Sequence, residues 1–99
     1  MLTKSQIEKL NANWGDKADS LACKAEVRIY DPDSTWEMMI YAMNPEDNDT
    51  IKCIVIPHKN FCAILDEWKL SEVTKFFNHF GEHPEIDKEF RPREVTELI

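Results

Sequence analysis

Residues 25–56 read AEVRIYDPDSTWEMMIYAMNPEDNDTIKCIVI and contain three extended runs separated by two polar segments. The runs are rich in Val, Ile, Tyr, Trp and Met, and they cover Ala25–Tyr30, Thr35–Met43 and Thr50–Ile56. Asp, Asn and Pro dominate the segments between them. β-branched and aromatic runs bounded by such residues are typical of strands joined by turns. The stretch therefore predicts an antiparallel hairpin unit around which the rest of the chain folds.

Alternation of apolar and polar side chains predicts which face of each strand is buried. In the first run, Ala25, Val27 and Ile29 are expected to share one face. The second run is apolar on both faces, which indicates a central strand or one covered by a helix. One face of that run is predicted to hold Trp36, Met38, Ile40 and Ala42. A fourth strand is predicted over Asn60–Trp68, with Phe61, Ala63 and Leu65 on one face.

Two helices are predicted on either side of these strands. The first begins after Thr3, because Thr3 and Gln6 have the spacing of a capping box. Asp16–Ser20 then reads as a polar loop. The second helix is expected to begin with Ser71 as N-cap and to end at Gly81. Its buried stripe is predicted to consist of Val73, Phe76, Phe77 and Phe80.

The C-terminal residues predict a short edge strand at Ile86–Phe90 and a last helical turn within Arg93–Ile99. A chain of 99 residues has an ordinary length for a single domain, residues 1–99. The predicted class is α+β: an antiparallel sheet of four to five strands, with an N-terminal helix and a Phe-rich helix packed mainly on one face.

The composition favours a soluble cytoplasmic protein that does not bind nucleic acid directly. The net charge of −7 opposes binding to phosphates and to anionic membranes, and it permits a basic protein partner. Solubility alone is an alternative explanation of the charge. Three cysteines are an odd number, which favours reduced thiols, and the charged N-terminal residues predict no secretion signal.

Residue types that suit catalysis or metal binding are present without the usual spacing. A zinc set of Cys53, His58, Cys62, His79 and His83 lacks a tight Cys-x2-Cys knuckle. The Asp66–Glu67 pair would need a cleft that perturbs one pKa, and a domain this small leaves little room for one. We therefore expect no catalytic residues, no metal and no cofactor. The alternatives are a small metal-dependent or carboxylate-using hydrolase and a structural homo-oligomer, with a homodimer as its simplest form.

Six acidic residues and no Lys or Arg lie between positions 31 and 50. These acids are Asp31, Asp33, Glu37, Glu46, Asp47 and Asp49. The two acidic turns are expected at opposite ends of the second strand, ~25–30 Å apart at about 3.3 Å per residue. If these turns contact a basic surface of the partner, replacing Glu46, Asp47 and Asp49 with Asn or Gln should slow association and barely change the stability of the fold.

Several motifs resemble those of the domain-of-unknown-function family 2958. They are Leu2-Thr3-Lys4-x-Gln6-Ile7-x-Lys9-Leu10, Tyr30–Trp36, Asn44–Asp47, Leu70-Ser71-Glu72 and Ile86–Pro92. The region Phe76–Pro84 departs from the family, which is richer in glycine there. The family occurs in phages, plasmids and other mobile elements and has no assigned catalytic residues. The resemblance implies an inhibitor that binds a host defence protein, such as an ATPase of a BREX-type restriction system, in the host bacterial cytoplasm.

Binding energy at protein interfaces comes mainly from a few large apolar anchors, and charges steer the encounter. Trp36 and Trp68 are the predicted anchors, although core packing is an alternative for both. The predicted steering acids are Asp31, Asp33, Glu46, Asp47 and Asp49.

Overall fold

The structure is a computed structural model that describes residues 2–58, 60–79 and 84–99, without the side chains of residues 76–79. The predicted helix end at Gly81 lies outside the described residues. So do Phe80, His83 and the side chains of Phe76, Phe77 and His79, and with them most of the predicted Phe stripe.

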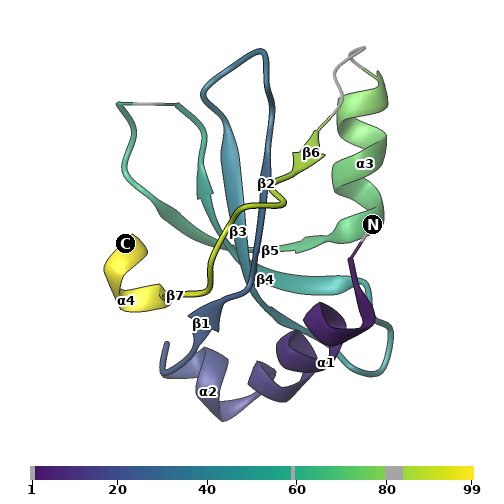
Figure 1. The fold of residues 1–99 in the computed structure, drawn as a ribbon, viewed down its shortest axis with the longest axis vertical. Coiled ribbons are helices and arrows are strands. Elements are labelled where there is room, and N and C mark those ends of the chain that lie inside the picture. Colours follow the sequence, from purple (N-terminus) through teal and green to yellow (C-terminus); the bar gives the residue numbers. More distant parts are fainter. Residues whose placement is uncertain (1, 59, 80–83) are drawn as a thin grey trace.

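An antiparallel sheet of five strands forms the centre of the molecule, in the order β5-β4-β3-β2-β6 (Figure 1). Its strands are β2 (Val27–Tyr30), β3 (Glu37–Met43), β4 (Thr50–Ile56), β5 (Ile64–Lys69) and β6 (Glu85–Ile86). A separate pair joins β1 (Lys24–Ala25) to β7 (Arg93–Glu94). The helices are α1 (Lys4–Asn13), α2 (Asp16–Asp19), α3 (Leu70–His79) and α4 (Val95–Leu98). The predicted α+β class and strand number are confirmed.

Both faces of the sheet are buried, by different helices. On one face, Leu10 of α1 and Val73 of α3 pack with Ile40, Cys53 and other residues of β2, β3 and β4. On the other face, Ala18 of α2 and Val95 of α4 pack with a second cluster that includes Ile54 of β4. The two longer helices therefore lie on one face, as predicted, and two short helices with the β1–β7 pair close the other. This double cover explains why β3 and β4 are apolar on both faces.

The alternation predicted for the first two strands is wrong at two neighbouring places. A β-bulge shifts the β3–β4 register between Ile40 and Ala42, so Ala42 joins Tyr41 on the α2/α4 face and leaves Ile40 on the α1/α3 face. The break between β1 and β2 likewise sends Ala25 to the opposite face from Val27. A bulge adds one residue to one strand, and side chains beyond it change face.

Other element boundaries also differ from the prediction. Asp16–Asp19 is a short helix rather than a loop, β5 begins at Ile64 rather than Asn60, and the edge strand is Glu85–Ile86 rather than Ile86–Phe90. The predicted start of α1 is confirmed, since the Thr3 hydroxyl accepts from the Gln6 amide and the Gln6 side chain accepts from the Thr3 amide. No helix in the described part of the chain is both long and apolar enough to cross a bilayer.

Candidate protein-binding surface

The residues predicted to bind a partner fall at the two ends of the sheet. Asp31, Asp33 and Trp36 belong to the β2–β3 turn, and residues 44–49 form the β3–β4 turn at the other end of β3 (Figure 1). Trp68 pairs with Ile51, close to the β3–β4 turn. Trp36 and Trp68 are both half-buried against the α1/α3-face core, so part of each ring is packing rather than free surface.

In the β2–β3 turn, the Asp31 carboxylate is part of the turn itself. Asp31 is only 3% exposed, and its Oδ1 accepts from the backbone N–H of Asp33 at 2.9 Å. The Asp31 carbonyl accepts from Ser34 at 3.2 Å, and the Ser34 hydroxyl accepts from the Trp36 amide at 3.1 Å. These bonds hold the turn in one conformation. Asp33, in contrast, is exposed at its tip.

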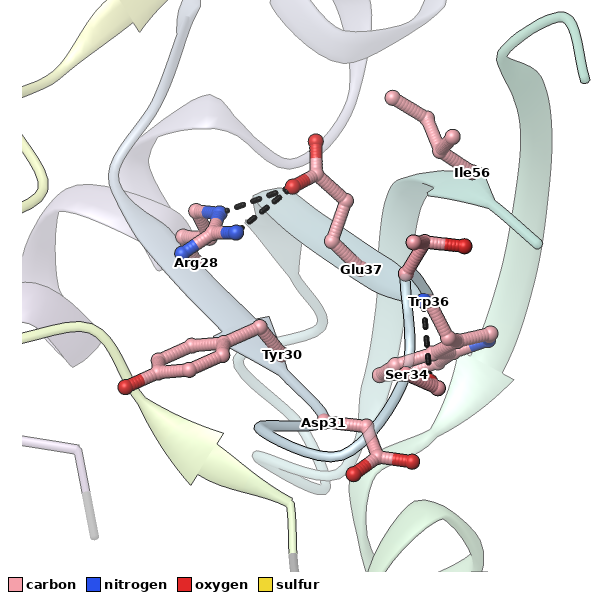
Figure 2. Close-up of a pocket in the computed structure, with 8 residues that line it drawn as sticks. Arg28, Tyr30, Asp31, Ser34, Trp36, Glu37 and Ile56 are labelled. Carbon is pink, nitrogen blue, oxygen red and sulfur yellow. Dashed lines mark hydrogen bonds and ion pairs between the residues drawn. The ribbon is translucent and has the colours of Figure 1, made fainter. Parts of the chain in front are cut away.

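A hollow of about 380 Å³ lies beside this turn and is lined by Arg28, Tyr30, Trp36 and Ile56 among others (Figure 2). The Arg28 guanidinium donates to Glu37 at 2.7 Å and to Asp87 at 3.0 Å, and it lies 4.6 Å from the centre of the Tyr30 ring. Burial by itself would lower the pKa of Arg28, but its hydrogen bonds and charge contacts with Glu37 and Asp87 raise it. The guanidinium is therefore paired with two carboxylates of the same chain.

At the opposite end, the Asp47 carboxylate organises the β3–β4 turn. It accepts from the Thr50 hydroxyl at 2.6 Å, from the Thr50 amide at 3.0 Å and from the Asp49 amide at 2.9 Å. The hydrogen bond from the Thr50 hydroxyl, followed by the two amide bonds, lowers the pKa of Asp47 to about 2. Hydrogen bonds to an ionised carboxylate favour its charged form. Asp47 is thus held as a local structural anion.

Asp49 connects the same turn to the start of α3. Its carboxylate accepts from the backbone amide of Ser71 at 2.9 Å and from the Ser71 hydroxyl at 2.8 Å, and its carbonyl accepts from Leu70 at 2.8 Å. The predicted N-cap role of Ser71 is therefore taken by an acid 22 residues earlier in the chain. These hydrogen bonds argue against the expectation that neutralising all three acids of this turn barely changes stability, because the Asp47 and Asp49 carboxylates both accept hydrogen bonds within the fold. Glu46 is exposed, and its carboxylate has no hydrogen bond or ion pair within the described residues.

Sequence reasoning missed the most exposed apolar side chains. Phe61, Ile64 and Leu65 are 60%, 48% and 45% exposed, and we call these three residues the apolar tip. They are three of the four large exposed apolar residues in the part of the chain that the structure describes. Their alternation suggested a half-buried strand, whereas β5 is the last strand of the sheet and the core reaches it only through half-buried Trp68.

The apolar tip lies at the same end of the sheet as Asp33 and Trp36. Glu37 of β3 pairs with Ile56 of β4, so the β4–β5 connection starts beside the base of the β2–β3 turn (Figure 1). In that connection the rings of His58 and Phe61 are 5.0 Å apart between centroids. One end of the sheet thus combines exposed apolar side chains with an exposed acid.

Two cysteines of the zinc set considered from the sequence differ strongly in their surroundings. Cys53 is fully buried in the α1/α3-face core, and burial raises the pKa of its thiol to about 12. Cys62 is exposed instead. Within the ranges that the structure describes, no three His, Cys, Asp or Glu side chains form a group able to hold a metal ion.

Comparison with known proteins matched no family model, no curated protein and no solved structure.

Proposed function

We propose that this protein is a small protein-binding inhibitor from a phage or mobile element that blocks a host defence protein by direct binding. The observation that carries this proposal is the exposed apolar tip of Phe61, Ile64 and Leu65 beside Asp33 and half-buried Trp36. Ile64 pairs with Val55 and Leu65 with Ile54, so the two side chains extend on opposite faces of the sheet edge. A partner that covers this edge would contact apolar side chains on both faces. Burying such side chains against a partner gains roughly 25 cal/mol per Å² of apolar area removed from water.

Two exposed acids of the turns, Asp33 and Glu46, could interact with a basic surface of the target. Asp33 and Glu46 are exposed, whereas the carboxylates of Asp31, Asp47 and Asp49 are occupied by hydrogen bonds within the chain. Exposed charges accelerate encounter with an oppositely charged surface and are screened by salt. We therefore assign the anchoring role to the apolar tip and Trp36, and the steering role to Asp33 and Glu46.

The nature of the target follows from the resemblance to domain-of-unknown-function family 2958 and, within it, to the phage protein OrbA, an inhibitor of the BREX restriction system. Size, acidity and motif order support that resemblance. We propose a protein of a BREX-type system as the target, with an ATPase as the first candidate.

The test is capture from a lysate of bacteria that carry a BREX-type system, followed by affinity measurement with the purified target. The unmodified protein should form a stoichiometric complex. The double variant Phe61→Ser, Ile64→Ser should bind about thirtyfold more weakly, as expected for loss of anchors contributing roughly 2 kcal/mol. Ile99→Ser is the matched control, because Ile99 is 55% exposed but lies at the C-terminus. Failure to recover a defence protein, or equal affinity for both variants, would contradict the proposal.

The steering role has its own measurement. Asp33→Asn and Glu46→Gln should each slow association at low salt and leave the dissociation rate nearly unchanged, because exposed charges act mainly on encounter. At high salt the difference from the unmodified protein should disappear. Association rates that are equal at both salt concentrations would show that these acids serve solubility alone.

A further inference from the structure

Strand β5 (Ile64–Lys69) is a six-residue edge of the sheet, whereas the opposite edge, β6, has two residues. The Leu70 amide donates to the Asp49 carbonyl at the end of the β4–β5 pairing. This hydrogen bond shows which residues of β5 direct their backbone N–H and C=O groups towards β4 and which direct them outwards. Because inward and outward groups alternate along an antiparallel strand, Asp66 and Trp68 pair with β4. The backbone groups of Leu65, Glu67 and Lys69 point away from the sheet.

One of these outward groups is shielded by a neighbouring side chain. Asp66 Oδ1 accepts from the Glu67 amide at 2.8 Å, and Asp66 Oδ2 accepts from the Trp68 indole at 2.8 Å. Asp66 is an exposed residue, so a competing backbone carbonyl can displace its carboxylate by a side-chain rotation. Side-chain shielding of this kind protects edge strands from indiscriminate pairing.

A second copy of this chain fits the edge poorly. Antiparallel self-pairing must match outward residues with outward residues. The two registers with the longest overlap place Glu67 opposite Glu67 of the second copy, or Asp66 opposite Asp66. Like charges directly opposite each other destabilise a sheet. The net charge of −7 on each copy adds to this repulsion.

The same pattern is complementary to a basic extended segment. The edge presents exposed Ile64 and Leu65, then the acids Asp66 and Glu67, then half-buried Trp68. We propose that β5 accepts an extended segment of the target protein as a sixth strand, with Lys or Arg opposite Asp66 and Glu67 and apolar residues opposite Ile64, Leu65 and Trp68. Strand addition of this kind uses backbone hydrogen bonds for affinity and side chains for selection. This inference rests on the proposed protein-binding function and names the surface and the partner's chemistry.

A synthetic peptide provides the probe. In antiparallel pairing, the sequence Glu-Val-Lys-Lys-Val-Val places Glu opposite Lys69 and the two Lys residues opposite Glu67 and Asp66. Its charge-reversed control is Lys-Val-Glu-Glu-Val-Val. A third peptide keeps the first sequence but is N-methylated at the three residues opposite Leu65, Glu67 and Lys69, which removes the donors that face β5. NMR titration of backbone amides gives both the dissociation constant and the location of binding.

The first peptide should shift the amides of β5 and should bind at least about tenfold more tightly than either control, because one control lacks the donors of three ladder bonds and the other reverses three charge pairs. Glu67→Pro should weaken binding to a similar extent, because proline removes an outward N–H that is not part of the β4 ladder. Glu67→Gln, which keeps the N–H, should weaken binding less. Asp66→Ala should tighten binding of an uncharged Val-rich peptide by removing the shield.

Two results would overturn the inference. The N-methylated peptide binding as tightly as its parent would show that charge alone drives association, and shifts away from β5 would place binding elsewhere. If Glu67→Pro fails to fold, the peptide controls still decide the question. The proposed function is tested separately. If a folded Glu67→Pro variant still captures the defence protein, strand addition is rejected and the inhibitor role is not. Failure to capture any defence protein would reject the inhibitor role and leave the peptide result standing.

Discussion

The two acidic turns at opposite ends of β3 resemble each other in sequence and differ in what their carboxylates do. In the β3–β4 turn, Asp47 and Asp49 hold the turn and the start of α3, and Asn11 of α1 donates to both the Met43 carbonyl and the Asn48 side chain. The β2–β3 turn buries only Asp31 and stands beside the exposed apolar tip. Acidity in a turn is thus compatible with an internal structural role as well as with a binding surface, and hydrogen-bond partners distinguish the two.

The largest stability effect that follows from this comparison is at Asp49. Asp49→Ala removes the carboxylate that caps α3 and leaves the Ser71 amide without that acceptor. We expect a loss of about 1–2 kcal/mol in the free energy of unfolding, the usual effect of deleting a helix cap. Urea denaturation of Asp49→Ala and Glu46→Ala measures it. Equal stability of the two variants would mean that the cap contributes nothing.

A smaller effect is expected at the other turn. Asp31→Ala should lower the free energy of unfolding by about 1 kcal/mol, because one hydrogen bond to a buried carboxylate is lost. Asp33→Ala, two residues away and exposed, should change it by less than about 0.5 kcal/mol. If the two substitutions destabilise alike, the contrast between the buried and the exposed acid of this turn is not real.

The two turns should also differ in how stability depends on pH, because the pKa of Asp47 in the β3–β4 turn is lowered. Its pKa is about 2 in the folded protein against an ordinary value of 3.8, so the unfolded chain binds the proton more tightly. The stabilising contribution is therefore fully present above pH 3.8 and is lost as the pH falls towards 2. Unfolding measured across this range should show a stability difference between the unmodified protein and Asp47→Ala that shrinks with acidification. A difference that stays constant would refute the hydrogen-bonded state of this carboxylate.

A similarly small stability effect is expected at the apolar tip. Phe61→Ser and Ile64→Ser should each change the free energy of unfolding by less than about 0.5 kcal/mol, because both side chains are mostly exposed. Thermal unfolding of these variants checks the expectation. Destabilisation by several times that amount would show that the tip packs against the fold and is not available to a partner.

The turn acids Asp47 and Asp49 accept several hydrogen bonds, whereas the Glu26 carboxylate, near the β-bulge, is poorly satisfied. Replacing Glu26 therefore tests whether a poorly hydrogen-bonded acid stabilises the fold. Its side chain is only 9% exposed, Lys9 lies 3.9 Å from Oε1, and Oε2 has no hydrogen-bond partner within the described residues. Glu26→Gln removes a buried charge while keeping the shape. We expect unfolding free energy to stay equal or to rise by about 1 kcal/mol. A marked loss of stability would instead show that the Lys9 ion pair is important.

Local sequence by itself determined the parts of this fold that depend on neighbours in the chain. The capping box of Thr3 and Gln6, the three strand runs and the positions of both acidic turns follow from interactions within a few residues. Turn residues, strand-forming runs and helix caps act over that short range, which is why the class and the strand number could be predicted.

Only the tertiary structure decided which faces of the strands are buried and which edges stay exposed. Asn13 of α1 donates to the Tyr41 carbonyl at the bulge, so a helix far away in sequence supports the point where Ala42 changes face. Asp49 caps α3 because strand pairing places its turn beside Leu70. Leu65 is exposed because the sheet ends at β5. Strand order and register are set by contacts between distant segments, and the periodicity of a single strand carries no information about its neighbours.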